Sequence, residues 1–161
     1  MPEKNVLGQF NEFVREHRDV LDISKVCPGI RSGIKKIIIG KGIVGIGSKT
    51  FEDCAGLRSI AIPDRVRSIG YDAFEDCTAL SSITIPHNIF VIRAGTFRGC
   101  TGLTSVAIPE GIFWIGRYAF SGCTGLRSVT ISEGVKEIEV HAFDGCLGIT
   151  SIVIPDRVGK I

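Results

Sequence analysis

Apolar residues recur along the chain at a constant spacing of 23 residues, from about residue 34 to the last residue. The spacing is clearest in a phenylalanine column and a cysteine column: Phe51, Phe74, Phe97, Phe120 and Phe143, and Cys54, Cys77, Cys100, Cys123 and Cys146. Isoleucine, leucine and valine columns keep the same phase without an insertion or deletion. A unit of this length cannot bury so many apolar groups alone, so the repeat predicts stacked coils that share one continuous core.

Each copy contains a short segment in which apolar and polar residues alternate. In the copy that ends at Pro86, the alternation predicts a β-strand with Ile83 and Ile85 inward and Ser82 and Thr84 outward. Equivalent strands in successive copies would lie parallel, about 4.8 Å apart. A later Val-x-x-Ile pair in each copy is predicted to re-enter the core from the opposite side of the coil.

Residues 5–26 interrupt the repeat and show helical periodicity instead, which predicts an amphipathic helix. Its apolar arc consists of Leu7, Phe10, Phe13, Val14, Val20 and Leu21. We expect this helix to cap the first coil, because the ends of a solenoid need shielding. A helix that binds a partner or dimerises is the alternative. The domain prediction is a helical cap over residues 1–33 and a solenoid over residues 34–161, which together form one domain.

The last repeat contains no polar capping unit, and Ile161 falls in an inward-facing column. Two interpretations fit this pattern. The chain is a piece of a longer repeat array, or the open C-terminal end packs against a second copy and produces a homo-oligomer.

The repeat carries a family resemblance. The pattern Ile-Gly-x-x-Ala-Phe-x-x-Cys-x-x-Leu-x-x-Ile-x-Ile-Pro-x-x-Val-x-x-Ile, seen from Ile69 to Ile92, resembles the BspA-like (Treponema pallidum-type) leucine-rich repeats. The resemblance implies an α/β repeat fold, a right-handed leucine-rich-repeat solenoid with short parallel strands. It also implies adhesion or protein binding at a cell surface or after secretion, and it brings no catalytic residues.

Composition and charge exclude several classes of function. Hydrophobic residues make up 44% of the chain and the mean hydropathy is +0.28, but the apolar runs are far shorter than a membrane helix of about 20 residues. The 19 Lys and Arg nearly balance the 17 Asp and Glu, so a nucleic-acid partner has no electrostatic support. The chain shows no secretory signal, and its localisation stays open.

The residue types that suggest chemistry follow the repeat rather than a site. Five of the six cysteines share one column without a Cys-x-x-Cys pair, so we expect buried free thiols rather than a metal centre or disulfides. The glycine-rich segment from Gly40 to Gly45 keeps the repeat phase, and no helical pattern follows it. His17, His87 and His141 lie in different phases and offer the serine column no base. We therefore predict no enzyme activity and no cofactor.

Candidate binding residues are the outward positions that depart from a plain solvated surface. Four apolar residues lie between the core positions of adjacent repeats: Phe90, Val91, Phe113 and Trp114. The small polar residues of the strand segments form a second candidate surface: Ser82, Thr84, Ser105, Ser128 and Thr130. Contiguous exposed apolar groups usually mark interaction sites. The hypothesis is a non-enzymatic protein-interaction or adhesion module. The alternative is a structural protein that self-assembles through its C-terminal end or through the apolar residues.

Overall fold

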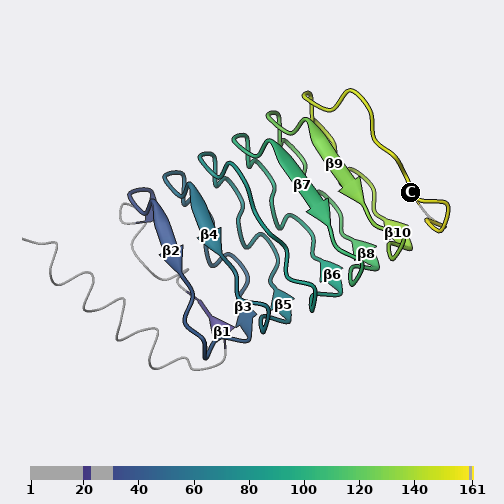
Figure 1. The fold of residues 1–161 in the computed structure, drawn as a ribbon. Coiled ribbons are helices and arrows are strands. Elements are labelled where there is room, and N and C mark those ends of the chain that lie inside the picture. Colours follow the sequence, from purple (N-terminus) through teal and green to yellow (C-terminus); the bar gives the residue numbers. More distant parts are fainter. Residues whose placement is uncertain (1–19, 23–30, 160) are drawn as a thin grey trace, which may run out of the picture.

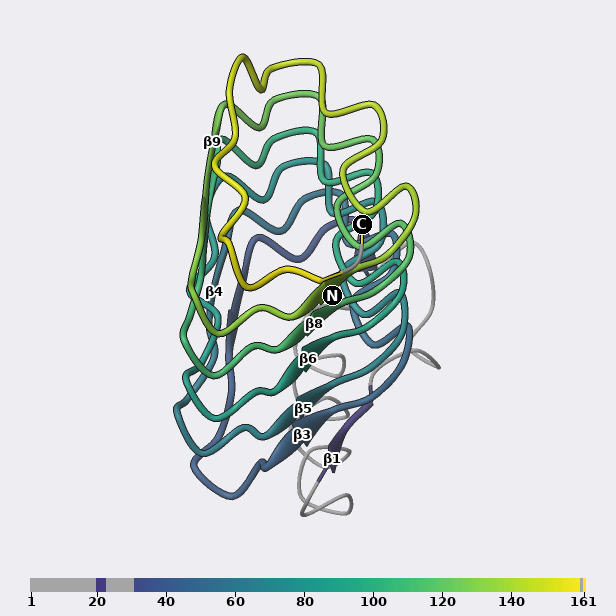
Figure 2. The same cartoon turned by 90° about the vertical axis from the view of Figure 1, so that its right-hand side faces the viewer.

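The computed structural model describes residues 20–22, 31–159 and 161. The described chain winds into a stack of coils with a row of short strands along each of two sides (Figure 1). A second view shows successive coils of similar outline, each displaced from the one before it by a similar step (Figure 2). Every pair of hydrogen-bonded strands is parallel, and paired residues are 23 positions apart from β2 onward. The predicted solenoid of stacked, parallel-stranded coils is confirmed.

The first row consists of the strands whose alternation is visible in the sequence. They are β2 (Lys36–Ile38), β4 (Ser59–Ala61), β7 (Ser105–Ile108) and β9 (Ser128–Ile131). β2 pairs with β4 and β7 pairs with β9. Burial alternates along each strand, with the inward isoleucine and valine residues buried and the intervening positions exposed, including Ile38 at the end of β2, so the inward and outward positions are as predicted.

The second row comprises two-residue strands, which lie, except for the first, at the Val-x-x-Ile segments of the repeat or at their Ile-x-x-Ile equivalents. They are β1 (Val20–Leu21), β3 (Gly45–Ile46), β5 (Ser68–Ile69), β6 (Val91–Ile92), β8 (Trp114–Ile115) and β10 (Glu137–Ile138). They form two parallel sheets, β1-β3-β5 and β6-β8-β10. The sequence predicts that these segments re-enter the core but not that they are strands, because two residues are too few to show an alternation.

Two of the predicted strands do not form, one at Ser82 to Pro86 and one in the last coil at Ser151 to Ile154. The segment from Ser82 to Pro86 keeps the expected burial, with Ile83 and Ile85 buried and Ser82 and Thr84 exposed, but it is not a strand. The backbone hydrogen bonds that join this coil to its neighbours just before the segment are long, at 3.4 and 3.3 Å. Alternating burial needs only an extended backbone, whereas a strand needs ladder hydrogen bonds of good geometry. The second row is interrupted beside the same coil, where β5 and β6 are not paired.

Most of the predicted N-terminal helix lies outside the described residues. In the described part, Val20–Leu21 is the strand β1, which pairs parallel with β3. The helix prediction is therefore wrong at these two residues. β3 pairs with β5 on one side and with β1 on the other, and a ladder formed with a neighbouring strand can override the local periodicity of a segment.

A column of phenylalanine rings forms the centre of the stack. Phe51, Phe74, Phe97 and Phe120 are at most 1% exposed, and Phe143 in the last coil is half-buried. Neighbouring rings are stacked, with centroid separations of 5.0 to 5.4 Å along the column. Aromatic pairs at such separations stabilise a core beyond the effect of area burial alone.

We predict that Phe97→Ala lowers the free energy of unfolding by about 3–5 kcal/mol, because it leaves a cavity in the middle of the column. Phe113→Ala is the matched control, since Phe113 is 48% exposed, and it should change the stability by less than about 1 kcal/mol. Urea denaturation followed by circular dichroism measures both values. Equal losses for the two variants would contradict the assignment of Phe97 to the core.

Candidate functional site

The structure brings the four apolar candidates together on the second row. We call Phe90, Val91, Phe113 and Trp114 the aromatic patch. Val91 of β6 and Trp114 of β8 are partners in the strand register, and the Phe113 N–H donates to the Phe90 carbonyl at 3.0 Å. Phe90 is 58% exposed and Phe113 is 48% exposed, while Val91 and Trp114 are half-buried. The patch therefore consists of two protruding rings beside a lower apolar pair.

Trp114 has a polar atom that the fold does not satisfy. Its indole Nε1 is buried and has no hydrogen-bond partner in the described structure. Buried donors are normally paired, so an unpaired one reduces the stability of the fold. On its other side, Trp114 pairs in register with Glu137 of β10, which is half-buried.

The second candidate surface lies on the other row of strands. Ser105 and Ser128 are register partners, and Ala107 pairs with Thr130 on β7 and β9. Ser82 and Thr84 lie in the coil that lacks a strand, and all five Ser and Thr candidates are exposed. We call these five residues the Ser/Thr face. The two rows occupy different sides of the stack, so the aromatic patch and the Ser/Thr face are separate surfaces (Figures 1 and 2).

The cysteine column is a ladder of free thiols. Four thiols each donate a hydrogen bond of 3.1 Å to the carbonyl of the phenylalanine 26 residues earlier. Cys54, Cys77, Cys100 and Cys123 are fully buried, and Cys146 in the last coil is half-buried. Burial raises the pKa of Cys54 to about 11 and that of Cys100 to about 12. These thiols stay protonated near neutral pH and act as small apolar residues that satisfy a backbone carbonyl.

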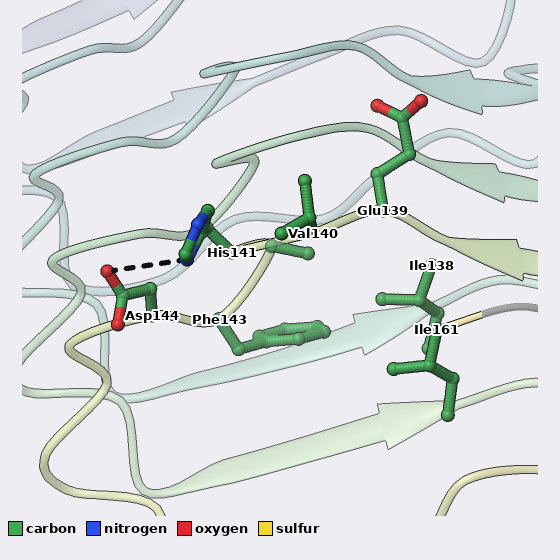
Figure 3. Close-up of a pocket in the computed structure, with 8 residues that line it drawn as sticks. Ile138, Glu139, Val140, His141, Phe143, Asp144 and Ile161 are labelled. Atoms are coloured by element: carbon green, nitrogen blue, oxygen red, sulfur yellow. Dashed lines mark ion pairs between the residues drawn. The ribbon is translucent and has the colours of Figure 1, made fainter.

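Among the described residues, no group of three or more His, Cys, Asp and Glu side chains could hold a metal ion. An open hollow of about 420 Å³ lies at the last coil (Figure 3). Phe143 lies in it between the His141–Asp144 pair and the side chains of Ile138 and Ile161. The His141 Nδ1 and the Asp144 Oδ2 are 3.9 Å apart, and both side chains are well exposed. The residues that line this hollow include no serine, threonine, cysteine or lysine.

The last coil is incompletely covered. Its core positions are half-buried, whereas the equivalent positions of the coil before it are buried. The half-buried positions are Phe143, Cys146, Ile149, Ile152, Ile154 and Val158. Ile161 is 78% exposed although its column faces inward in the earlier coils.

A row of stacked polar and aromatic side chains is present that the sequence does not reveal. Arg93 lies over the Tyr71 ring at 5.1 Å, and Arg117 lies over the Tyr118 ring at 4.9 Å. Tyr118 stacks on His141 with centroids 5.1 Å apart, and both residues have a positive φ. Bulky residues rarely adopt this backbone conformation. The sequence gives only a weak signal for this backbone conformation. The column that contains Tyr118 and His141 also holds Gly95, but its mixture of residue types does not indicate a left-handed position.

Two rows of parallel strands around a core that repeats every 23 residues define a leucine-rich-repeat β-solenoid. The family model of the BspA type leucine-rich repeat region matches residues 44–161 in six copies, and the chain belongs to this family. The resemblance inferred from the repeat pattern is therefore confirmed. No curated protein matches the sequence.

Several solved structures are similar to the chain. A leucine-rich cell surface protein from Faecalibacterium prausnitzii is 36% identical, with a TM-score of 0.69 over 73% of this chain and 31% of that one. A leucine-rich repeat protein from Eubacterium ventriosum is 22% identical, with a TM-score of 0.59 over 78% and 40% of the two chains. The pneumococcal vaccine antigen PcpA is 18% identical, with a TM-score of 0.61 over 79% and 36%. The chain thus spans about a third of the length of these proteins, and the two less identical ones support the fold alone.

In the part of the chain that the structure describes, no helix has the length and apolar character required to cross a membrane.

We predict that iodoacetamide at pH 8 labels Cys146 before the four buried thiols of the ladder. The buried thiols are covered by the stack, and the raised pKa of Cys54 and Cys100 keeps both protonated at this pH. Mass spectrometry of the digested protein measures labelling at each site, with a urea-unfolded sample as the control in which all sites react. Rapid labelling of Cys77 or Cys100 in the native protein would contradict the ladder.

Proposed function

We propose that the chain is a non-enzymatic protein-binding module that holds a partner against the aromatic patch. The observation that carries the proposal is the exposure of two phenyl rings on adjacent coils, which the core does not require. In contrast, the equivalent positions of the flanking coils are the polar residues Arg67 and Lys136. A contiguous apolar patch with a polar rim is typical of a binding surface on an otherwise solvated protein.

The energetics of the patch suit an interface. At about 25 cal/mol per Å² of apolar area, burial of each protruding ring would contribute about 2–3 kcal/mol to binding. The backbone under the rings is fixed by the β6-β8-β10 sheet, so little conformational entropy is lost in the patch on binding. Trp114, the single tryptophan of the chain, adds a residue type that is enriched among binding hot spots.

The proposed biological setting is adhesion at a cell surface, and one relative supports the surface location. The Faecalibacterium prausnitzii relative is described as a cell surface protein, and it shares more than a third of its aligned residues with this chain. The Ser/Thr face is a second contact surface in this proposal. Its small side chains allow close approach of a partner but provide no large anchor, so it supports binding rather than initiating it.

We predict that Phe90→Ser with Phe113→Ser abolishes partner binding and leaves the fold intact. The matched control is Ile38→Ser, which removes an apolar side chain that is 78% exposed on the other row. The unchanged chain, the control and the patch variant are each crosslinked to their partners in host and self-cell extracts. Quantitative mass spectrometry then compares the partners that each of the three proteins recovers. The same partners should be retained by the control and lost by the patch variant. Retention of all partners by the patch variant would overturn the proposal.

A second candidate function, self-assembly, is supported by the last coil. Its half-buried core positions and the 78% exposed Ile161 leave apolar surface at the C-terminal end of the stack. A second copy that covered this surface would return it to the burial found in the earlier coils. The stack would then continue across two chains as a structural assembly.

Self-assembly through this end predicts that the chain sediments as a concentration-dependent oligomer. Ile161→Asp should shift it to a monomer, because a carboxylate would be buried without a partner. Val153→Asp is the control, since Val153 is 79% exposed but is an outward residue of the repeat. Analytical ultracentrifugation measures the self-association of the unchanged chain and of both variants. A monomer at all concentrations, or an equal effect of the two substitutions, would contradict this second function.

A further inference from the structure

We propose that the partner segment bound by the aromatic patch is an extended stretch with an apolar residue between two acidic ones. This inference rests on the proposed function and names the chemistry of its partner. It starts from four exposed residues that each immediately precede a strand of the second row: Arg67, Phe90, Phe113 and Lys136. We call these four residues the cation–aromatic row.

The order of the cation–aromatic row follows from the 23-residue register. The Lys136 N–H donates to the Phe113 carbonyl at 2.8 Å, and the Phe113 N–H donates to the Phe90 carbonyl at 3.0 Å. Arg67 occupies the same position of the coil before Phe90, beside β5. The two phenyl rings are therefore flanked by one positive charge at each end of the row.

Both cations are available to a partner. Neither Arg67 nor Lys136 forms an ion pair within the described part of the chain. By contrast, Arg98 pairs with Glu75 and Lys49 pairs with Glu52 on another part of the surface. Glu137, the carboxylate next to Lys136 in the sequence, is half-buried beside Trp114, whereas Lys136 is exposed.

The spacing of the row fits an extended peptide. Four side chains on coils about 4.8 Å apart span about 14 Å. An extended chain rises about 3.3 Å per residue, so residues i and i+4 are about 13 Å apart, and residues i, i+2 and i+4 point to the same side. A segment of the form acidic-x-apolar-x-acidic thus places its carboxylates at Arg67 and Lys136 and its apolar side chain between the two rings.

The same charges disfavour a second copy of this chain as the occupant. A two-fold axis that brought two such rows face to face would place Arg67 against Lys136, or each cation against its own copy. Either arrangement juxtaposes like charges, which costs free energy and weakens the complex. The row therefore favours a partner of opposite charge over self-association through the aromatic patch.

The test uses three fluorescein-labelled synthetic peptides with the cores Glu-Ser-Leu-Ser-Glu, Lys-Ser-Leu-Ser-Lys and Glu-Ser-Ser-Ser-Glu. Fluorescence anisotropy measures their binding, and with unlabelled peptides the emission of Trp114 reports whether the occupied site is the patch. We expect the Glu-Ser-Leu-Ser-Glu peptide to bind saturably and at least tenfold more tightly than the other two. No saturable binding of this peptide, or equal binding of the glutamate and lysine peptides, would overturn the inference.

Charge reversal provides the matched control. Arg67→Glu with Lys136→Glu should reverse the preference, so that the lysine peptide binds more tightly than the glutamate peptide. Arg58→Glu with Arg127→Glu changes the net charge equally at exposed positions next to the first row of strands and should leave the preference unchanged. A similar loss of glutamate-peptide binding in both double variants would show a general charge effect and overturn the inference.

The same variants separate this inference from the proposed function. If Arg67→Glu with Lys136→Glu keeps all the crosslinked partners that Phe90→Ser with Phe113→Ser loses, the patch binds protein but the acidic flanks are wrong. If the phenylalanine variant also keeps them, the proposed function itself fails.

Discussion

Successive coils of this protein are fixed to one another by one repeated set of contacts. The N–H groups of Phe51, Phe74, Phe97 and Phe120 each donate at 2.8 Å to the carbonyl found 22 residues later. A thiol of the later coil donates back to the phenylalanine carbonyl of the earlier one. The rings themselves stack between these contacts. This register determines which residues face the core and in which column each outward residue lies.

The register separates the core from the surface so completely that outward positions can vary without changing the fold. The position before each second-row strand holds Arg67, Phe90, Phe113 and Lys136 in turn, while the valine and isoleucine columns beside it stay buried. A surface of this kind consists of parallel columns, and the residue type at each outward position can change independently of the core. In the proposed function, the order of residue types along a column, rather than a pocket, would set the binding specificity.

Much of the core could be predicted from the sequence, because the 23-residue period reports burial directly. The strands β2, β4, β7 and β9 of the first row could also be predicted from their alternation, but the equivalent segments that begin at Ser82 and Ser151 alternate in the same way without forming strands. The two-residue strands of the second row could not be predicted, because pairing between coils rather than local pattern creates them. The helical periodicity at Val20–Leu21 likewise does not show the pairing with β3 that makes these residues a strand. Both surfaces were found as sequence candidates, whereas the stacking of Tyr118 on His141 depends on backbone dihedrals that no residue type there indicates.

Amide hydrogen exchange measured residue by residue tests the register most directly. The account predicts that the N–H groups of Phe51, Phe74, Phe97 and Phe120 are strongly protected and exchange at similar rates, because the same contact holds each one. The Phe143 N–H has no such acceptor among the described residues and should exchange much faster in the monomer. Fast or unequal exchange of the four inner amides, or protection of Phe143 equal to theirs, would contradict the claim that this register organises the molecule.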